Sequence, residues 1–320
     1  MNSMIKKILK PVLLPPYKWL TKDKIWIRKL LSTISPTYAS RRLYKQAFGK
    51  SLNLKNPQSL NEKALWLKLN TYYNNPLITE CCDKYLVHDY VKRAGCAEIL
   101  NELLAVWDSP DEINFDELPN QFVLKCNHGC GYNIIVKDKS KLNIAETKKK
   151  LASWLKEDYW KLYAETQYKF IKKKIIAEKF IKTKDETLPE DYKFFCINGI
   201  PDCVMLCTDR ESGKPKFFYF DRQLQYRPEF SDACASKNKI QVDSRIRGKI
   251  AKNIDIMFIY AEKLAKPFPF VRVDLYNVDG RIIFGELTFL SSGGFDPDSY
   301  SVKDSAIDIT RKIDKSHYEK

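Results

Sequence analysis

The chain has 320 residues, of which 44% are hydrophobic and 30% charged, and it contains no low-complexity tract or fixed-period repeat. This composition excludes a disordered, fibrous or solenoid protein and is typical of a globular protein with two lobes or domains. The net charge is +15, and the first fifty residues carry most of it, with twelve Lys or Arg against a single acid, Asp23. Residues 1–50 are therefore a basic segment attached to a nearly balanced body.

Apolar residues interleave with the cations of this basic segment: Leu9, Val12, Leu13, Leu14, Trp19, Leu20, Trp26, Ile27, Leu30 and Leu31. The pattern is typical either of contact with an anionic membrane surface, through residues 1–35, or of helices packed on the body. A nucleic-acid partner is not expected, because no recognition motif accompanies the charge.

The basic segment is not expected to cross a membrane or to act as a secretion signal. Lys10, Pro11, Pro15 and Pro16 interrupt its one apolar run well short of the roughly 20 residues that a span needs. We therefore expect a cytoplasmic protein, either free or at the inner face of the membrane.

Nine cysteines form an odd and irregularly spaced set. Cys126 and Cys130 flank His128, which is one possible half of a zinc site, but no second ligand pair completes it. We expect no structural zinc, and reduced cysteines that pack as small apolar side chains.

Apolar periodicity and turn residues predict an α+β fold with antiparallel sheets. A capping box, in which Ser59 precedes Glu62 by three residues, marks a helix start, and Asn198-Gly199 marks a tight hairpin. The expected helices are 59–69, 81–94, 144–172 and 245–265, and the expected strands and hairpins are 122–126, 134–136, 174–181, 192–209, 216–220 and 270–290.

A lysine at the end of a predicted strand precedes two glycines in the next loop. Lys125 offers a fixed cation, and Gly129 and Gly131 allow close approach of the backbone, so the segment suits a phosphate cradle. An ordinary surface hairpin has the same pattern. The spacing is not that of a Walker loop.

The last predicted hairpin places two carboxylates where the sheet should be half buried. Asp274 and Glu286, with the hydroxyl of Thr288, form an oxygen-rich group of the kind that Mg²⁺ prefers when it binds nucleotide phosphates. The alternative is a buried ion pair, Asp274 with Arg272 or Glu286 with Arg281.

Five segments, taken in order, resemble the ATP-grasp superfamily, and most closely its TupA-like branch, named after a teichuronopeptide biosynthesis protein. They read DKYLVHDYV, LPNQFVLKCNHGCG, IIAEKFI, DYKFFCINGIPD and FVRVDLYNVDGRIIFGELTF. The resemblance runs from about Ser51 to Pro297, and blocks 121–131 and 270–289 are the most specific. It implies a nucleotide held between two α+β lobes.

The resemblance divides the chain into a basic segment 1–50, a region 51–118 before the lobes, lobe one at 119–181, lobe two at 182–300 and a tail at 301–320. It also assigns site residues. ATP would meet Lys84, Lys125, His128, Gly129, Gly131, Glu178, Lys179 and Ile181; Mg²⁺ would meet Asp274, Glu286 and Thr288; and Arg272 and Lys193 would be cations beside the reacting phosphate. Thr288 departs from the asparagine usual in the superfamily, and His88 stands where this branch would have arginine.

The activity that the resemblance implies is ATP- and Mg²⁺-dependent joining of a carboxylate to an amine through an acyl phosphate. The expected substrates are a carboxylate-bearing saccharide, such as a uronic acid of a bacterial cell-surface polysaccharide, and an amine or amino acid. Alternatives are a glycosyltransferase, since Asp296 and Asp298 form a D-x-D motif, a sugar kinase on the same fold, and a nucleotide sensor without catalysis.

Overall fold

The computed structural model describes residues 24–184, 188–210, 215–227, 244–295, 308–310 and 313. The first part of the basic segment, Cys234, the D-x-D motif at Asp296 and Asp298 and most of the tail lie outside these residues. Predictions made for those positions are not addressed by the fold.

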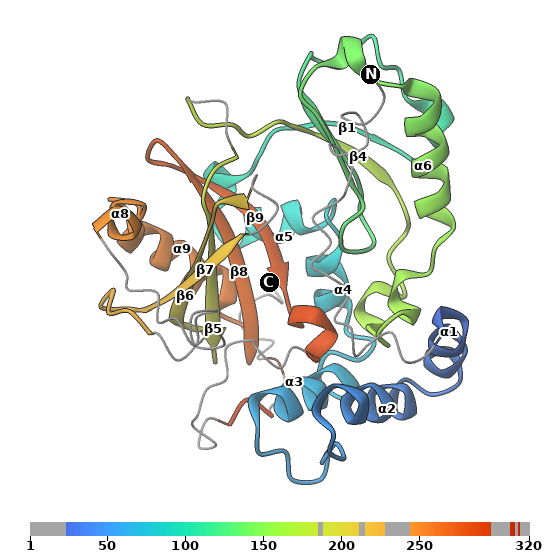
Figure 1. Cartoon of the computed structure of the whole chain (residues 1–320), viewed down its shortest axis with the longest axis vertical. Coiled ribbons are helices and arrows are strands. Elements are labelled where there is room, and N and C mark those ends of the chain that lie inside the picture. Colours follow the sequence, from blue (N-terminus) through green and yellow to red (C-terminus); the bar gives the residue numbers. More distant parts are fainter. Residues whose placement is uncertain are drawn as a thin grey trace, which may run out of the picture.

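Two antiparallel sheets and the helices around them form an α+β fold, as predicted (Figure 1). The helices are α1 Ile25–Ile34, α2 Pro36–Phe48, α3 Leu60–Leu69, α4 Pro76–Cys82, α5 Val87–Arg93, α6 Ile144–Lys156, α8 Ser244–Gly248 and α9 Ile254–Ala265. The strands are β1 Leu103–Trp107, β2 Phe122–Cys126, β3 Asn133–Val136, β4 Ile175–Lys179, β5 Asp191–Ile197, β6 Ile200–Thr208, β7 Lys216–Asp221, β8 Phe270–Val278 and β9 Arg281–Thr288.

The first sheet has the strand order β1-β4-β2-β3, and the second has the order β7-β6-β5-β8-β9. Helix α6 covers the outer side of the first sheet and α9 that of the second (Figure 1). Separate apolar cores lie under the two sheets, the first around Phe122 and Leu151 and the larger one around Phe194 and Met257. Each sheet can therefore hold its own group of polar side chains.

Elements with strong local signals lie where the sequence predicts them. Ser59 and Glu62 form the expected capping box at the start of α3. The hairpin of β5 and β6 turns at Asn198 and Gly199, whose φ angles of 51° and 83° suit a tight turn.

Three predicted helices were too long. The stretch 81–94 holds only the end of α4, a break and then α5. The break arises because the Asp83 carboxylate accepts hydrogen bonds from the backbone N–H groups of Tyr85 and Leu86 and starts a new turn. The stretch 144–172 is helical only to Lys156 and continues as two short 3-10 turns.

The stretch 245–265 is likewise two helices, α8 and α9, rather than one. Over the parts of the chain that the structure describes, none of the helices has the length and hydropathy needed to cross a bilayer.

Candidate active site

The loop after β2 is tied to the segment between α4 and α5. The Lys84 ammonium donates a hydrogen bond to the carbonyl of Gly129, and the backbone N–H of Lys84 donates to the carbonyl of Asn127 at 3.2 Å. The structure therefore brings together Lys84 and the glycine loop, which are 45 residues apart in the sequence.

A buried pair, Asp83 and Asn127, holds this junction. The Asn127 amide donates to the Asp83 carboxylate and to the carbonyl of Lys172, each at 2.9 Å, and its side-chain oxygen accepts from the N–H of Lys174 at 2.7 Å. One side chain thus links three segments. Sequence reasoning did not select this pair, although an Asp that ends one helix and caps the next turn is a recognisable signal.

Aromatic rings pack against the loop glycines. A Cβ atom added to Gly129 would lie 2.7 Å from Cγ of Tyr159 and 2.9 Å from Cε2 of Tyr132. Gly131 has a φ of 77°, which L-residues with a side chain rarely adopt. The two glycines therefore serve different needs, close packing at Gly129 and a left-handed backbone at Gly131.

Lys125 pairs with Glu178 on one face of the first sheet. Val123 lies directly opposite Glu178, so Lys125, two residues on, reaches the carboxylate diagonally, with 2.7 Å between its Nζ and the carboxylate oxygen. Burial alone would lower the pKa of Lys125, but Glu178 raises it, with smaller contributions from Tyr276 and Glu286 of the second sheet. Lys125 therefore lies within electrostatic range of two side chains of the second sheet.

The end of β4 already has partners within the protein. The N–H of Lys179 donates to the carbonyl of Glu102 at 3.0 Å, and the carbonyl of Lys179 accepts from the Asn101 amide at 2.9 Å. The Lys179 ammonium pairs with the Glu102 carboxylate at the surface. Ile181, half-buried, follows β4 and completes the predicted hinge.

His128 is buried in the loop, and its Nε2 donates to the carbonyl of Trp154 at 3.1 Å. Burial lowers the pKa of His128 to about 4. The ring is therefore neutral at neutral pH and contributes no positive charge to the loop.

In the second sheet, three charged side chains form one row across β5, β8 and β9. Lys193 lies opposite Asp274, and Asp274 lies opposite Glu286. A bulge at Gly285 sets this register, and a Cβ on Gly285 would lie 2.9 Å from the carbonyl oxygen of Asp274. The bulge thus allows β8 and β9 to align the two carboxylates.

Asp274 is enclosed by cations. Its side chain is 3% exposed, and it accepts hydrogen bonds from Nε and Nη2 of Arg272, both at 2.7 Å, and from the Lys193 ammonium at 2.5 Å. Burial alone would raise the pKa of Asp274, but Arg272 and Lys193 hold it below its usual value. The predicted alternative, an Asp274–Arg272 ion pair, is present, and the Glu286 carboxylate is likewise paired with Arg272, at 3.4 Å.

The three oxygen donors predicted for a metal converge on one atom. Nη2 of Arg272 lies 2.7 Å from Oδ2 of Asp274, 3.4 Å from Oε1 of Glu286 and 3.1 Å from Oγ1 of Thr288. Two carboxylates and a hydroxyl are hard oxygen donors, and they already surround a cationic nitrogen. The donor set therefore fits Mg²⁺, with Arg272 as the group that must give way.

Among the residues whose placement is described, no three His, Cys, Asp or Glu side chains gather to bind a metal ion, and Cys126, His128 and Cys130 do not form such a group. The eight described cysteines are free thiols, and all but Cys130 are buried, as expected.

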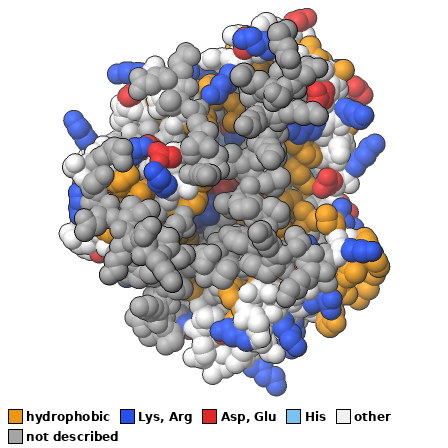
Figure 2. All heavy atoms as spheres, in the orientation of Figure 1, with side chains coloured by type: hydrophobic (Ala, Val, Ile, Leu, Met, Phe, Trp, Pro, Cys, Tyr) orange, Lys and Arg blue, Asp and Glu red, His pale blue; other side chains and the backbone are white. Residues whose placement is uncertain are grey.

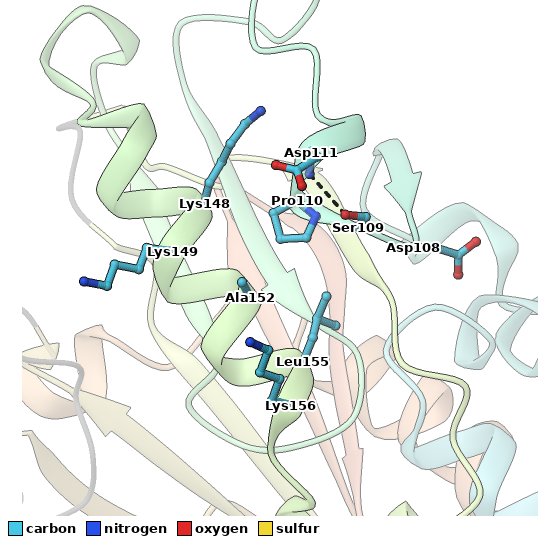
Figure 3. Close-up of a pocket in the computed structure, with 9 residues that line it drawn as sticks. All are labelled: Asp108, Ser109, Pro110, Asp111, Lys148, Lys149, Ala152, Leu155 and Lys156. Carbon is cyan, nitrogen blue, oxygen red and sulfur yellow. Dashed lines mark hydrogen bonds between the residues drawn. The ribbon is translucent and has the colours of Figure 1, made fainter.

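Two pockets lie away from these residues. One, of about 440 Å³, lies between α6 and the turn at Pro110 (Figure 3). The figure shows Lys149 and Asp108 pointing in opposite directions, and Asp108 is paired with Lys174 at 2.8 Å. A second pocket, of about 430 Å³, lies beside Arg222, and none of the predicted site residues lines either pocket.

Comparison with known proteins decides the family. The family model described as TupA-like ATP-grasp matches residues 62–307, which include both sheets and every predicted site residue. The chain belongs to the TupA-like ATP-grasp family. The comparison with curated proteins gave no match.

Solved structures with a similar arrangement include three ligases or synthetases. D-alanine–D-alanine ligase from Bacillus anthracis is 20% identical, with a TM-score of 0.34, over 66% of this chain and 56% of that one. L-amino acid ligase from Bacillus licheniformis is 14% identical, with a TM-score of 0.40, over 82% of this chain and 57% of that one.

N5-carboxyaminoimidazole ribonucleotide synthetase from Thermotoga maritima is 12% identical, with a TM-score of 0.35, over 65% of this chain and 41% of that one. This TupA-like chain thus spans about half the length of the solved structures that it matches.

Proposed function

We propose that this TupA-like protein is an ATP- and Mg²⁺-dependent carboxylate–amine ligase. The observation that carries the proposal is the convergence of Asp274, Glu286 and Thr288 oxygens on a single cationic nitrogen of Arg272. Such a position is preorganised for a divalent cation. A Mg²⁺ ion there would neutralise charge on the nucleotide phosphates.

The residues of the first sheet are proposed to hold ATP. Lys84 and Lys125 would exchange their present partners, the Gly129 carbonyl and Glu178, for phosphate oxygens. The loop with Gly129 and Gly131 would lie over the phosphates, with the neutral His128 positioning it. Glu178 and the backbone of Lys179 to Ile181 would meet the adenosine, with Ile181 as the free end of the hinge.

Arg272 and Lys193 are proposed to stabilise the charge that develops during transfer. A substrate carboxylate oxygen forms a bond to the γ-phosphorus as the bond to the β-phosphate oxygen breaks, which yields an acyl phosphate and ADP. An amine then attacks the acyl carbon, phosphate leaves, and the amine loses a proton to phosphate or water. Two buried cations beside a carboxylate row are suited to orienting such anions.

The proposed acceptor is a carboxylate-bearing saccharide, such as a uronic acid of a cell-surface polysaccharide or its precursor, and the proposed donor is an amine or amino acid. Support comes from the match to the TupA-like family. We also propose that residues 119–181 and 182–300 act as the two lobes, and that the enzyme works in the cytoplasm, where ATP is available.

The proposal is tested by nucleotide-dependent thermal shift followed by product analysis. ATP with Mg²⁺ should raise the melting temperature, whereas a UDP-sugar should not. With glucuronate and a panel of amino acids, ADP and phosphate should form together only when an amine is present. A phosphorylated sugar as the final product would instead indicate a kinase, and turnover of UDP-sugars a glycosyltransferase.

The matched variant is Glu286→Gln, which keeps the size of the side chain. The Glu286 side chain is 43% exposed, so the fold should be retained. We expect ATP turnover to fall at least about 100-fold, because a charged ligand beside the phosphates is lost. Wild-type turnover in this variant would remove the metal assignment.

A further inference from the structure

Helix α1 buries polar residues and exposes apolar ones, which is the reverse of the usual arrangement in a helix packed on a protein core. The residues of this helix that are buried are Arg28 and Ser32. Four of its large apolar side chains are exposed, whereas Ile27 and Leu31 are half-buried, and the exposed Tyr38 lies at the start of α2. The exposed fractions are 59% for Ile25, 61% for Trp26, 50% for Leu30, 71% for Ile34 and 55% for Tyr38.

The polar side of α1 is turned inward because it meets a polar partner. Burial raises the pKa of Tyr163, and the charge and hydrogen bond of Arg28 oppose that rise. The helix also packs against the turn at Tyr159–Lys161. The inward orientation of Arg28 therefore fixes the apolar side toward solvent.

Figure 2 shows this apolar face as a group of orange side chains at the lower right, where Figure 1 places α1. We define it as the α1 face: Ile25, Trp26, Leu30, Ile34 and Tyr38. Single exposed apolar residues need no explanation, but five on adjacent turns of one helical hairpin indicate a partner.

The charge around the α1 face identifies the chemistry of that partner. Residues 24–50 contain seven Lys or Arg and no Asp or Glu, and Lys24, Arg41 and Lys45 are exposed. The preceding 23 residues add five lysines and one aspartate. Two copies of so basic a surface would repel one another, whereas an anionic bilayer attracts it.

We propose that the α1 face docks on an anionic membrane surface. The apolar side chains enter the boundary between headgroups and acyl chains, Trp26 and Tyr38 lie at the level of the headgroups, and the flanking cations meet lipid phosphates. The helix lies along the surface and does not cross it. The catalytic proposal does not depend on this contact, and its residues lie on other elements.

The experiment is co-sedimentation of the full-length protein with vesicles, without nucleotide. Vesicles of phosphatidylglycerol and phosphatidylcholine in equal parts are compared with vesicles of phosphatidylcholine alone. The test variant is Trp26→Ser/Leu30→Ser/Ile34→Ser. The control is Ile256→Ser/Ile259→Ser, which removes apolar side chains that are 47% and 52% exposed on α9.

Wild-type protein and the α9 control should bind the anionic vesicles equally, and the α1 variant at least about tenfold more weakly, since its apolar anchors are gone. Binding should fall as salt is raised. Equal binding by the α1 variant, or no binding by the wild type, would overturn the proposal. So would an α1 variant that converts an oligomer to monomers, which would make the face an interface between copies.

Deletion of residues 1–23 separates the two parts of the basic segment. The shortened protein should still prefer anionic vesicles through α1, although more weakly because five lysines are lost. An increase in its binding would show that residues 1–23 cover the α1 face, which contradicts the proposal. We expect the circular dichroism spectrum and the ATP turnover of the α1 variant to be unchanged. This result would show that membrane docking can be lost while the fold and catalysis are retained.

Discussion

The two sheets hold the charges of the candidate active site in different ways. In the second sheet, Asp274 is almost completely buried between Arg272 and Lys193, and its ionised form depends on both cations. In the first sheet, the Lys125–Glu178 pair has a lysine that is 25% exposed, and the Lys84 ammonium donates a hydrogen bond to the uncharged carbonyl of Gly129. The second sheet therefore stabilises its charges as part of the fold, whereas the first can exchange partners for a ligand at lower cost.

The largest expected effect comes from Asp274→Asn. This change leaves two buried cations without a full countercharge, and we expect the free energy of unfolding to fall by about 3–5 kcal/mol. Urea denaturation measures it. In the control Glu286→Gln, the change should stay within about 0.5 kcal/mol because that carboxylate is half exposed. Equal losses of unfolding free energy in Asp274→Asn and Glu286→Gln would show that burial does not set the cost of removing the charge.

Lys125→Met should have a smaller effect, about 1–3 kcal/mol, because the site is partly open to solvent. Lys125 holds the pKa of Glu178 below its usual value, although burial alone would raise it. This stabilisation is present above the unfolded pKa of about 4.3 and is lost as pH falls through the lower folded value. The stability difference between wild type and variant should therefore shrink in acid.

The matched control for Lys125→Met is Lys179→Met. It breaks an exposed pair with Glu102 on the same sheet, so its effect on stability should be slight. A difference between wild type and Lys125→Met that grew as pH fell would contradict the assigned pairing.

Gly129→Ala tests the packed loop of the first sheet. The added methyl group would meet the rings of Tyr159 and Tyr132, and we expect a loss of about 1–2 kcal/mol together with weaker ATP binding. Calorimetric titration of ATP measures the binding. Gly248→Ala is the control, because nothing lies within 4 Å of the added atom. An unchanged affinity in Gly129→Ala would show that the loop does not contact the nucleotide.

The effect expected from His128→Asn is smallest at neutral pH and develops only as the solution is made acid. The folded pKa of His128 is about 4, lower than the unfolded value of about 6.5. The unfolded chain therefore binds more protons between these values, and this residue destabilises the fold as pH falls from about 6.5 to about 4. The wild type should lose up to about 1.4 kcal/mol per pH unit more than the variant over that window. If the free energies of unfolding of wild type and variant changed equally with pH, His128 would carry a positive charge in the folded loop, which would contradict its low pKa.

Local signals account for what the sequence predicted well. The capping box of Ser59 and the Asn198-Gly199 turn involve residues within a few positions of one another, so their geometry follows from short-range chemistry. The spacing of Arg272 and Asp274 on one strand likewise allowed their ion pair to be anticipated.

Long-range contacts account for what it did not predict. Asp83 meets Asn127 across 44 positions, and that contact makes the α4–α5 break part of the site. The meeting of Thr288 with Arg272 depends on the Gly285 bulge, because an unbulged strand would shift the register by one residue and turn these side chains to opposite faces.

The same limit applies to α1. Its sequence predicts an amphipathic helix, but only the position of Arg28 against Tyr163 shows which side is turned outward. Composition leaves open whether the basic segment contacts a membrane or packs on the body. Because the orientation of α1 is known, the membrane contact can be tested by substituting its exposed apolar residues.

We expect Asp274, Glu286 and Thr288 to bind a metal ion when Arg272 moves away. The most direct measurement is anomalous diffraction from a crystal grown with Mn²⁺ and a non-hydrolysable ATP analogue. We expect a manganese peak within coordination distance of these oxygens and beside the phosphates, with Nη2 of Arg272 displaced. A bound nucleotide with the metal elsewhere, while Arg272 still contacts all three oxygens, would contradict it.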